Sequence, residues 1–388
     1  MTSKTKAALW ATIILATLSV AEAQTFTMLH TFTGKDGANP QSTLIEDAAG
    51  NFYGTTFYDG ASGYGTVFKM DTSHNVTVLY SFSGSPDAAN PSGPLLMDSS
   101  GNLYGTTVWG GASNYGTVFK VSSTGEETVL YSFAGGPNDG MNPEGGVIGD
   151  AAGNLYGTTQ GGGNGKGCGY YYCGVVFELN ASGQETILHN FSGSVDDGAN
   201  PWAGLLRDAA GNLYGTTVYG GANGLGTVFK LDTTGAVTLL HSFTGTDGAY
   251  VYGRVIADSK GNLYGTAYEG GKSRVGTVFK LNKANKLTVL HDFTGKTDGA
   301  YPADGLVRDA AGNLYGTTAQ GGSSSNFGTV FKVDSAGKES VLHSFTKSKQ
   351  GKLPEAGLLL DRAGNLYGTT YFGGPHNSDD GTVYKLTP

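Results

Sequence analysis

Residues 211–232 read GNLYGTTVYGGANGLGTVFKLD. The stretch is rich in glycine, yet Leu213, Tyr214, Val228 and Phe229 are the apolar, aromatic and β-branched residues that strands favour. A disordered linker lacks such residues. A phosphate-binding glycine loop leads into a helix or contains Gly-Lys-Ser/Thr, and this stretch has neither pattern. We therefore interpret it as two β-strands joined by a glycine-rich loop.

The same pattern recurs along the chain. The string Gly-Asn-(Leu/Phe)-Tyr-Gly-Thr occurs seven times, with its asparagine at Asn51, Asn102, Asn154, Asn212, Asn262, Asn313 and Asn365. Successive copies are 50 to 52 residues apart, except for a spacing of 58 in the unit that holds both cysteines. A regular period of this length indicates a repeat architecture.

Each period contains four strand-like segments, which in the fourth unit are residues 202–208, 212–217, 226–232 and 236–243. Asp-x-x-Gly turns join the first segment to the second and the third to the fourth, as in tight β-hairpins. Seven units of four antiparallel strands predict an all-β fold, a seven-bladed β-propeller.

The phase of the repeat supports a closed ring. Residues 26–32 read like a fourth strand without the first three, and residues 381–388 read like a third strand without a fourth. In a propeller the N-terminal strand would complete the last blade as its outermost strand and remove an exposed edge. A β-solenoid, which would gain nothing from this offset, and a pair of smaller β domains are the alternatives.

The propeller interpretation assigns the loops to two faces. Short Asp-x-x-Gly hairpins lie on one face, while the longer loops after the Tyr-Gly-Thr strand and the loops between blades lie on the other, which we name the loop face. Binding residues usually lie on such loops. The glycine inside the Tyr-Gly-Thr strand is expected to make room for an aromatic ring of the adjacent blade.

On these residues the unit GNLYGTT…GG…GTVF resembles the GloVer tandem repeat of exported bacterial proteins, and the resemblance covers all seven units. It implies a secreted, propeller-like repeat protein and no particular activity. Members of the family often carry a C-terminal surface-anchoring tail. None is recognisable before Pro388, so an anchor is not expected.

The N-terminus has the layout of a secretory signal peptide. Lys4 and Lys6 precede an apolar run, and Ala21-Glu22-Ala23 is a suitable cleavage site, so residues 1–23 are predicted to be removed. Residues 24–388 would then form a single propeller domain, secreted or periplasmic, without a further membrane span and expected to be a monomer. A net charge of −8 argues against nucleic acid as a partner.

The two cysteines, Cys168 and Cys173, are expected to form a disulfide, because export places them in an oxidising compartment. Two thiols without a nearby histidine make a weak zinc site.

Most ionisable residues recur once per unit, which favours structural roles. Five histidines occupy one column of the fourth strand, where Tyr80 and Tyr131 stand in other units. One aspartate column caps the first hairpin: Asp47, Asp98, Asp150, Asp208, Asp258, Asp309 and Asp361. A second column, the crossing-loop aspartates, lies between blades: Asp36, Asp87, Asp139, Asp197, Asp247 and Asp298. Calcium is conceivable at the second column. No cofactor, metal site or catalytic residue is assigned.

Aromatic residues vary between units on the loop face, and they are the candidate ligand-binding residues: Tyr58, Trp109, Trp202, Tyr219, Tyr250, Tyr252, Tyr301 and Phe372. Such rings can stack on sugar C–H surfaces or contact a protein loop. The alternative is that they only pack the loops together.

We predict a non-catalytic binding protein for carbohydrate or another envelope or extracellular polymer. A polysaccharide hydrolase or lyase acting at the central channel and a structural surface module are the alternatives. Catalysis needs the symmetry to be broken at one place, and the clearest departures are the cysteine insertion, Arg254 and the last crossing loop. None of these contains a recognisable acid/base pair.

Overall fold

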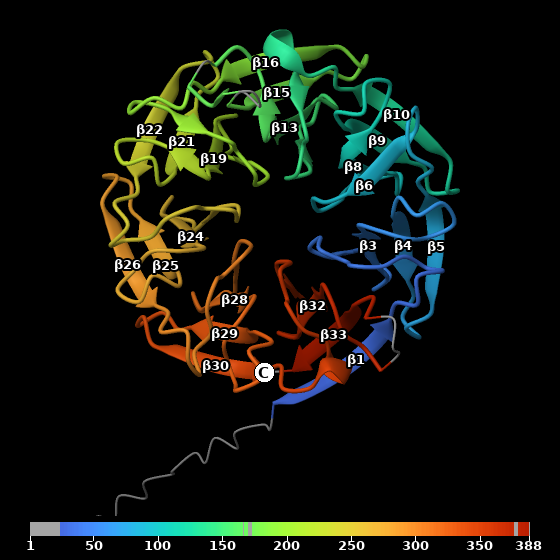
Figure 1. The fold of residues 1–388 in the computed structure, drawn as a ribbon, viewed down its shortest axis with the longest axis vertical. Helices are drawn as coiled ribbons and strands as arrows, with labels where there is room; N and C mark the ends of the chain where they lie inside the picture. Colours follow the sequence, from blue (N-terminus) through green and yellow to red (C-terminus); the bar gives the residue numbers. More distant parts are fainter. Residues whose placement is uncertain (1–23, 166, 170–172, 376–378, 388) are drawn as a thin grey trace, which may run out of the picture.

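The protein is a ring of seven antiparallel sheets around a central channel (Figure 1). The computed structural model describes residues 24–165, 167–169, 173–375 and 379–387. The predicted signal segment, residues 1–23, lies outside the described residues. The ring confirms the seven-bladed β-propeller.

Four strands build each blade, and blades are numbered here from the first complete unit. The innermost strands are β2 (Ile45–Glu46), β7 (Leu96–Met97), β12 (Val147–Gly149), β18 (Leu206–Arg207), β23 (Ile256–Ala257), β27 (Val307–Arg308) and β31 (Leu359–Leu360). The second strands are β3 (Phe52–Thr56), β8 (Leu103–Gly110), β13 (Leu155–Thr159), β19 (Leu213–Thr217), β24 (Leu263–Ala267), β28 (Leu314–Thr318) and β32 (Leu366–Thr370).

The outer half of each blade follows the same order. The third strands are β4 (Thr66–Met70), β9 (Thr117–Val121), β15 (Val175–Leu179), β21 (Thr227–Leu231), β25 (Thr277–Leu281), β29 (Thr329–Val333) and β33 (Thr382–Thr387). The outermost strands are β5 (Val76–Ser81), β10 (Glu127–Ser132), β16 (Glu185–Asn190), β22 (Val237–Ser242), β26 (Leu287–Asp292), β30 (Glu339–Ser344) and β1 (Thr25–Thr31). Shorter elements on the loop face are β6 (Ala88–Pro91), β11 (Gly140–Met141), β14 (Gly161–Gly162), β17 (Gly198–Ala199), β20 (Tyr219–Gly220) and the 3₁₀ turns η1 (Gly136–Asn138) and η3 (Ser348–Gln350).

The ring closes as the phase of the repeat predicts. Strand β1 pairs antiparallel with β33, with Phe26 opposite Leu386 and Thr31 opposite Thr382. The first strand of the chain is therefore the outer edge of blade 7 (Figure 1). Because of this closure, blade 7 has four strands like the other blades, and the outer edge of β33 is covered.

The innermost strands are shorter than predicted: residues 202–208 were expected to be one strand, but only Leu206 and Arg207 pair as β18. The preceding residues crowd against the neighbouring blades. A Cβ at Gly93 would lie 2.1 Å from the Gly146 nitrogen, and one at Gly145 would lie 2.3 Å from the Ala203 carbonyl carbon. These segments therefore leave the sheet and line the end of the channel.

Aromatic pairs join each blade to the next. The phenylalanine that follows each outermost strand meets a ring in the third strand of the following blade, edge to face and with ring centroids 5.0 to 5.3 Å apart. The pairs are Phe32–Phe68, Phe82–Phe119, Phe133–Phe177, Phe191–Phe229, Phe243–Phe279, Phe293–Phe331 and Phe345–Tyr384.

One prediction about these rings is wrong. The glycine of the Tyr-Gly-Thr strand makes room for a ring of its own blade and not of the adjacent one. Gly54 lies directly opposite Phe68 across strands β3 and β4, and a Cβ there would come within 2.8 Å of the ring. The cross-strand partner therefore fills the space over the glycine.

The hairpin aspartates cap their turns as predicted. Asp47 accepts hydrogen bonds from the backbone nitrogens of Ala49 and Asn51, from the Asn51 side chain and from the Tyr53 hydroxyl, at 2.7 to 3.0 Å. The same bonds to the asparagine and the tyrosine recur at the hairpins of the other six blades. These aspartates are fully used in holding the fold.

Candidate functional site

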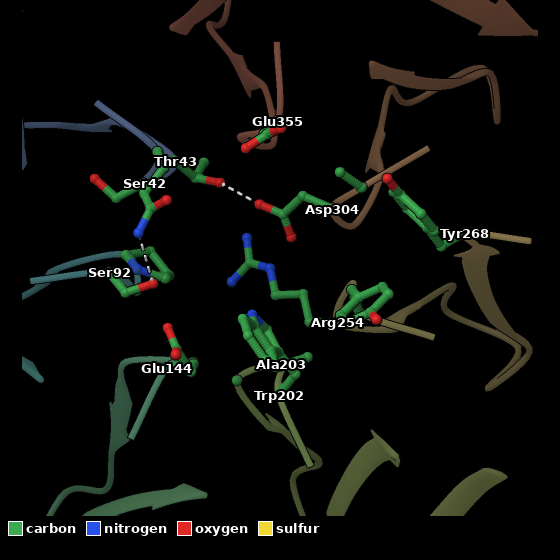
Figure 2. Close-up of a pocket in the computed structure, with 17 residues that line it drawn as sticks. Ser42, Thr43, Ser92, Glu144, Trp202, Ala203, Arg254, Tyr268, Asp304 and Glu355 are labelled. Carbon is green, nitrogen blue, oxygen red and sulfur yellow. Dashed lines mark hydrogen bonds between the residues drawn. The ribbon is translucent and has the colours of Figure 1, made fainter. Parts of the chain in front are cut away.

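A cavity of about 300 Å³ opens at the loop-face end of the channel, where the segments entering the innermost strands converge. Below it the channel continues as a mainly apolar space of about 510 Å³, lined by leucine, isoleucine and valine side chains of the innermost strands. Arg254 lines both spaces. The side chains around the upper cavity are drawn in Figure 2.

One position of the repeat contributes a lining residue from every blade. It lies six residues before the hairpin aspartate and holds Gln41, Ser92, Glu144, Trp202, Tyr252, Ala303 and Glu355. Six residue types occupy these seven places, whereas the position just before it is proline in six of the seven units. The ring symmetry is thus broken at the place where all seven blades meet.

The cavity has an aromatic side. The ring of Trp202 meets that of Tyr252 edge to face at 5.4 Å, Tyr252 meets Tyr268 at 5.2 Å, and Tyr268 meets Tyr301 at 5.1 Å. We name these four residues the aromatic arc. They come from blades 4 to 6 and form one continuous row of rings.

Two tyrosines beside the cavity are held in an unfavourable backbone conformation. In six crossing loops a residue with a left-handed backbone precedes a proline, and in the loop of blade 5 the equivalent residue precedes Val251. In four blades this residue is asparagine: Asn39, Asn90, Asn142 and Asn200. Each of these asparagines also donates a side-chain hydrogen bond of 2.8 to 2.9 Å to a carbonyl of the preceding blade. The equivalent positions in blades 5 to 7 hold Tyr250, Tyr301 and Leu353, with φ of 56°, 58° and 55°.

This exchange has a cost, because asparagine tolerates the left-handed region far better than larger residues do. Tyr250 and Tyr301 give up both the favourable backbone and the bond to the neighbouring blade. What they gain is a ring near the cavity: Tyr301 completes the aromatic arc, and Tyr250 packs against Tyr219 at 5.5 Å. Strain of this kind often marks a functional site.

Asp304 ties three blades together across the cavity. Its carboxylate accepts hydrogen bonds from the Thr43 hydroxyl at 3.1 Å, from the Gly357 nitrogen at 2.7 Å and from the Gly305 nitrogen at 2.6 Å. The Thr43 bond is visible in Figure 2. These three donors fix the position of the carboxylate.

Glu144 lies on the opposite side and is only 8% exposed. Burial raises its pKa to about 7, and a hydrogen bond with Ser92 partly offsets that rise. Ser92 in turn accepts a bond of 3.2 Å from the side-chain amide of Gln41. Burial also raises the pKa of Glu355. The cavity therefore holds carboxyl groups that take up protons more readily than exposed ones.

Arg254 projects into the middle of the cavity, between Asp304 and Glu144 in Figure 2. Among the residues that the structure describes, its guanidinium forms no hydrogen bond and no ion pair. The same repeat position holds Thr43, Pro94, Gly146, Gly204, Gly305 and Gly357 in the other blades. A single blade thus places a cation where the other six carry no charge.

The eight predicted binding residues fall into two groups. Trp202 and Tyr252 line the cavity, Tyr301 extends the aromatic arc, and Tyr250 contacts Tyr219. The other four residues lie outside the cavity and form backbone bridges with the crossing loop. The bridged pairs are Ala38 with Tyr58, Ala89 with Trp109, Ala199 with Tyr219 and Lys352 with Phe372. Tyr58, Trp109 and Tyr219 are 44%, 43% and 46% exposed.

Several lining residues were not among those predicted. They are Gln41, Ser92, Glu144, Tyr268, Asp304 and Glu355, together with Arg254, which was noted as a departure from the repeat without being assigned to the site. The variability of the position six residues before the hairpin aspartate, compared across the seven units, could have found Gln41, Ser92, Glu144 and Glu355. It gives no signal for Tyr268, Asp304 or Arg254, which stand at other positions of the repeat.

The crossing-loop aspartates bind the histidine column as a structural role requires. His30, His241 and His189 lie 2.7, 2.9 and 3.2 Å from their aspartates, and Tyr80 and Tyr131 donate to theirs at 3.1 Å. Within the described ranges, no three His, Cys, Asp or Glu side chains are grouped so as to hold a metal ion. Calcium at these loops stays a prediction.

The cysteines form the predicted disulfide. Cys168 and Cys173 are joined with their Cα atoms 5.2 Å apart, and both contact the hydrophobic core between blades 3 and 4. Among the described residues, no helix has the length and hydrophobicity that crossing a membrane requires.

Fold and site together define a closed seven-bladed propeller with an aromatic and charged cavity at one end of its channel. The chain belongs to the Gloeobacter/Verrucomicrobia repeat family, whose model matches residues 1–170 and 165–384. This confirms the resemblance seen in the repeat. A search of curated proteins gave no match.

Among solved structures, the chain is similar to virginiamycin B lyase from Staphylococcus aureus, with a TM-score of 0.61, 12% identity, and 94% of this chain and 99% of that chain covered. It is also similar to the extracellular domain of a proposed one component system of B. thetaiotaomicron, with a TM-score of 0.55 and 10% identity. That match covers 89% of this chain and 38% of the other chain. A gluconolactonase from Xanthomonas campestris matches with a TM-score of 0.43, 16% identity, and 79% and 87% covered. At 12% and 10% identity, the first two likenesses show the fold alone.

Proposed function

We propose that this protein is an exported binding protein that holds a carbohydrate in the cavity at the loop-face end of its channel. The observation that carries the proposal is the pairing of the aromatic arc with polar side chains on the opposite side, Gln41, Ser92 and Glu144. Sugars present flat C–H faces and a rim of hydroxyls, so they need both kinds of surface. Aromatic rings suit the first, and amide, hydroxyl and carboxyl groups suit the second.

The dimensions of the site agree with a small ligand. A volume of about 300 Å³ is at the lower end of the usual range for ligand pockets. The exposed rings of Tyr58, Trp109 and Tyr219 lie outside the cavity on the same face. In this proposal they would contact a longer polymer beyond its bound end.

Export is part of the proposal. The predicted signal peptide leads into a chain with a disulfide, and disulfides persist mainly outside the cytoplasm. The protein would then meet its ligand in the periplasm or outside the cell.

Calorimetric titration of the mature protein with short soluble oligosaccharides tests the proposal. Trp202→Ala should weaken binding about tenfold or more, which corresponds to about 1.4 kcal/mol. Trp109→Ala is the matched control, since it removes the same ring from the same face without touching the cavity, and it should leave short ligands unaffected. Equal losses in both variants, or no binding by the wild type, would reject the cavity as a carbohydrate site.

A second candidate is a polysaccharide hydrolase or lyase. The raised pKa of Glu144, about 7, favours it, because carboxyl groups with such pKa values can act as acid or base near neutral pH. An enzyme would release reducing ends or unsaturated products from a polysaccharide panel, and Glu144→Gln would abolish that release. A purely structural module would show neither binding nor products.

A further inference from the structure

We propose that the ligand is an acidic saccharide, a sugar carrying a carboxylate, and that Arg254 binds this carboxylate in the middle of the cavity. The inference rests on the proposed function and deepens it by naming the class of sugar. Four features of the site support it: the free guanidinium, the space built around it, the state of the neighbouring carboxyl groups and the lack of further cations.

The guanidinium of Arg254 has donors without acceptors. It carries five N–H groups, and among the described residues none of them is bonded to another side chain or to the backbone. A cation held in a partly enclosed space without a partner is unfavourable. A carboxylate is the natural counterpart, because its two oxygens match the planar fork of arginine.

The surrounding backbone makes room for this side chain. A Cβ at Gly305 would lie 2.7 Å from the Arg254 carbonyl oxygen and 3.0 Å from its Cγ. Any other residue at Gly305 would therefore push the arginine out of its position. The absence of a side chain at Gly305 therefore provides the space that Arg254 occupies.

The carboxyl groups in the cavity do not satisfy Arg254. Asp304 uses its oxygens to accept bonds from Thr43, Gly305 and Gly357. Glu144 is held by Ser92 and has a pKa raised by burial to about 7, and burial also raises the pKa of Glu355. An acceptor supplied by the ligand is therefore the missing partner.

A carboxylate fits better than a phosphate. Arg254 is the one cationic side chain among the described residues that line the cavity, whereas Glu144, Asp304 and Glu355 line it as well. Phosphate sites usually combine several cations or a nest of backbone N–H groups, and their doubly charged ligand would be repelled here. A singly charged sugar that also stacks on Trp202 and Tyr252 suits this balance.

Protonation of Glu144 should assist the binding. The groups that share its cavity are Asp304, Glu355, Arg254 and the phenols of Tyr252 and Tyr268. At pH 6 a largely neutral Glu144 would no longer repel the sugar carboxylate and could donate a hydrogen bond to it. Above pH 7 the ionised form repels it, so affinity should fall by up to about tenfold per pH unit as one proton is lost.

The experiment compares uronate oligosaccharides with the same oligosaccharides after reduction of each carboxylate to a primary alcohol, by calorimetry at pH 6. The wild type should prefer the acidic form at least tenfold. Arg254→Gln should reduce that preference to near unity, mainly by weakening the acidic form, and Arg254→Lys should retain part of the preference. Trp202→Ala should weaken both forms equally.

The outcomes separate the two proposals. Equal binding of both forms by the wild type, or a preference that survives in Arg254→Gln, overturns the assignment of Arg254 and leaves carbohydrate binding standing. Binding of neither form overturns both. Repeating the titrations at pH 8 should weaken the acidic ligand about tenfold in the wild type and much less in Glu144→Gln, and thermal melts of each variant establish that it is folded.

Discussion

Tyr384 carries a hydroxyl that the fold does not use. It stands in β33 at the position where the other six third strands have phenylalanine: Phe68, Phe119, Phe177, Phe229, Phe279 and Phe331. The side chain is fully buried, and burial raises the pKa of its phenol. Among the described residues the hydroxyl has no hydrogen-bond partner. Tyr384→Phe should therefore stabilise the protein.

The size of the effect follows from the environment. Leaving a buried polar group unsatisfied costs about 1–3 kcal/mol. The ring contacts should survive the substitution, because Tyr384 meets Phe345 at 5.3 Å in the same edge-to-face arrangement that the phenylalanine pairs adopt. With an unfolding entropy of about 2.1 cal mol⁻¹ K⁻¹ per residue over a mature chain of roughly 365 residues, the melting temperature should rise by about 1–4 °C.

Urea unfolding and thermal melts of the two proteins, under identical conditions, measure the difference. The matched control is Phe331→Tyr, which places the same hydroxyl in the neighbouring blade and should be destabilising by a similar amount. If Tyr384→Phe is instead less stable than the wild type, the hydroxyl has a partner, such as an internal water molecule, and the reasoning fails.

Two further predictions concern single positions. Burial lowers the pKa of His343 to about 4, so the folded state favours the neutral ring. The free energy of unfolding should therefore fall as the pH drops from 6.5 towards 4. The urea midpoints at pH 7 and pH 4.5 should differ more in the wild type than in His343→Phe. Tyr301→Asn should relieve the left-handed backbone and can restore a bond to the Tyr268 carbonyl, raising the unfolding free energy by about 1 kcal/mol while weakening oligosaccharide binding. A Tyr301→Asn protein that binds as tightly as the wild type would exclude this ring from the site.

The fold could be predicted because the same sequence unit occurs seven times in the chain. The structure confirms three predictions that rest on local chemistry or on the number of strands per unit. They are the capping by the hairpin aspartates, the pair of strands in stretches such as residues 211–232, and the pairing of the unmatched strands at the two ends. The short innermost strands could not be predicted in the same way. Their ladder is interrupted by contacts between blades, as at Gly93 and Gly146, which no local pattern reveals.

The cavity was harder to predict, because its residues are brought together only by closure of the ring. Glu144 and Arg254 are 110 positions apart in the sequence and belong to different blades, yet they line one space. The sequence pattern does not distinguish the exposed ring of Trp109 from that of Trp202, which lines the cavity, because both belong to loops of the same face. The closed ring places Trp202 at the channel and Trp109 outside the cavity, and the spacing of residues in the sequence does not reveal this difference.

Departures from the repeat become informative once the structure shows where they gather. A residue needed for the fold recurs in every blade, as the hairpin aspartates do, whereas blades 5 and 6 give up repeated features at the cavity. Arg254 replaces glycine or another uncharged residue, and Tyr250 and Tyr301 replace asparagines that would have bonded the adjacent blade. Each change costs stability, about 1–3 kcal/mol for a strained backbone alone. Since Arg254 lines the cavity and Tyr250 and Tyr301 pack beside it, these departures from the repeat gather around the cavity.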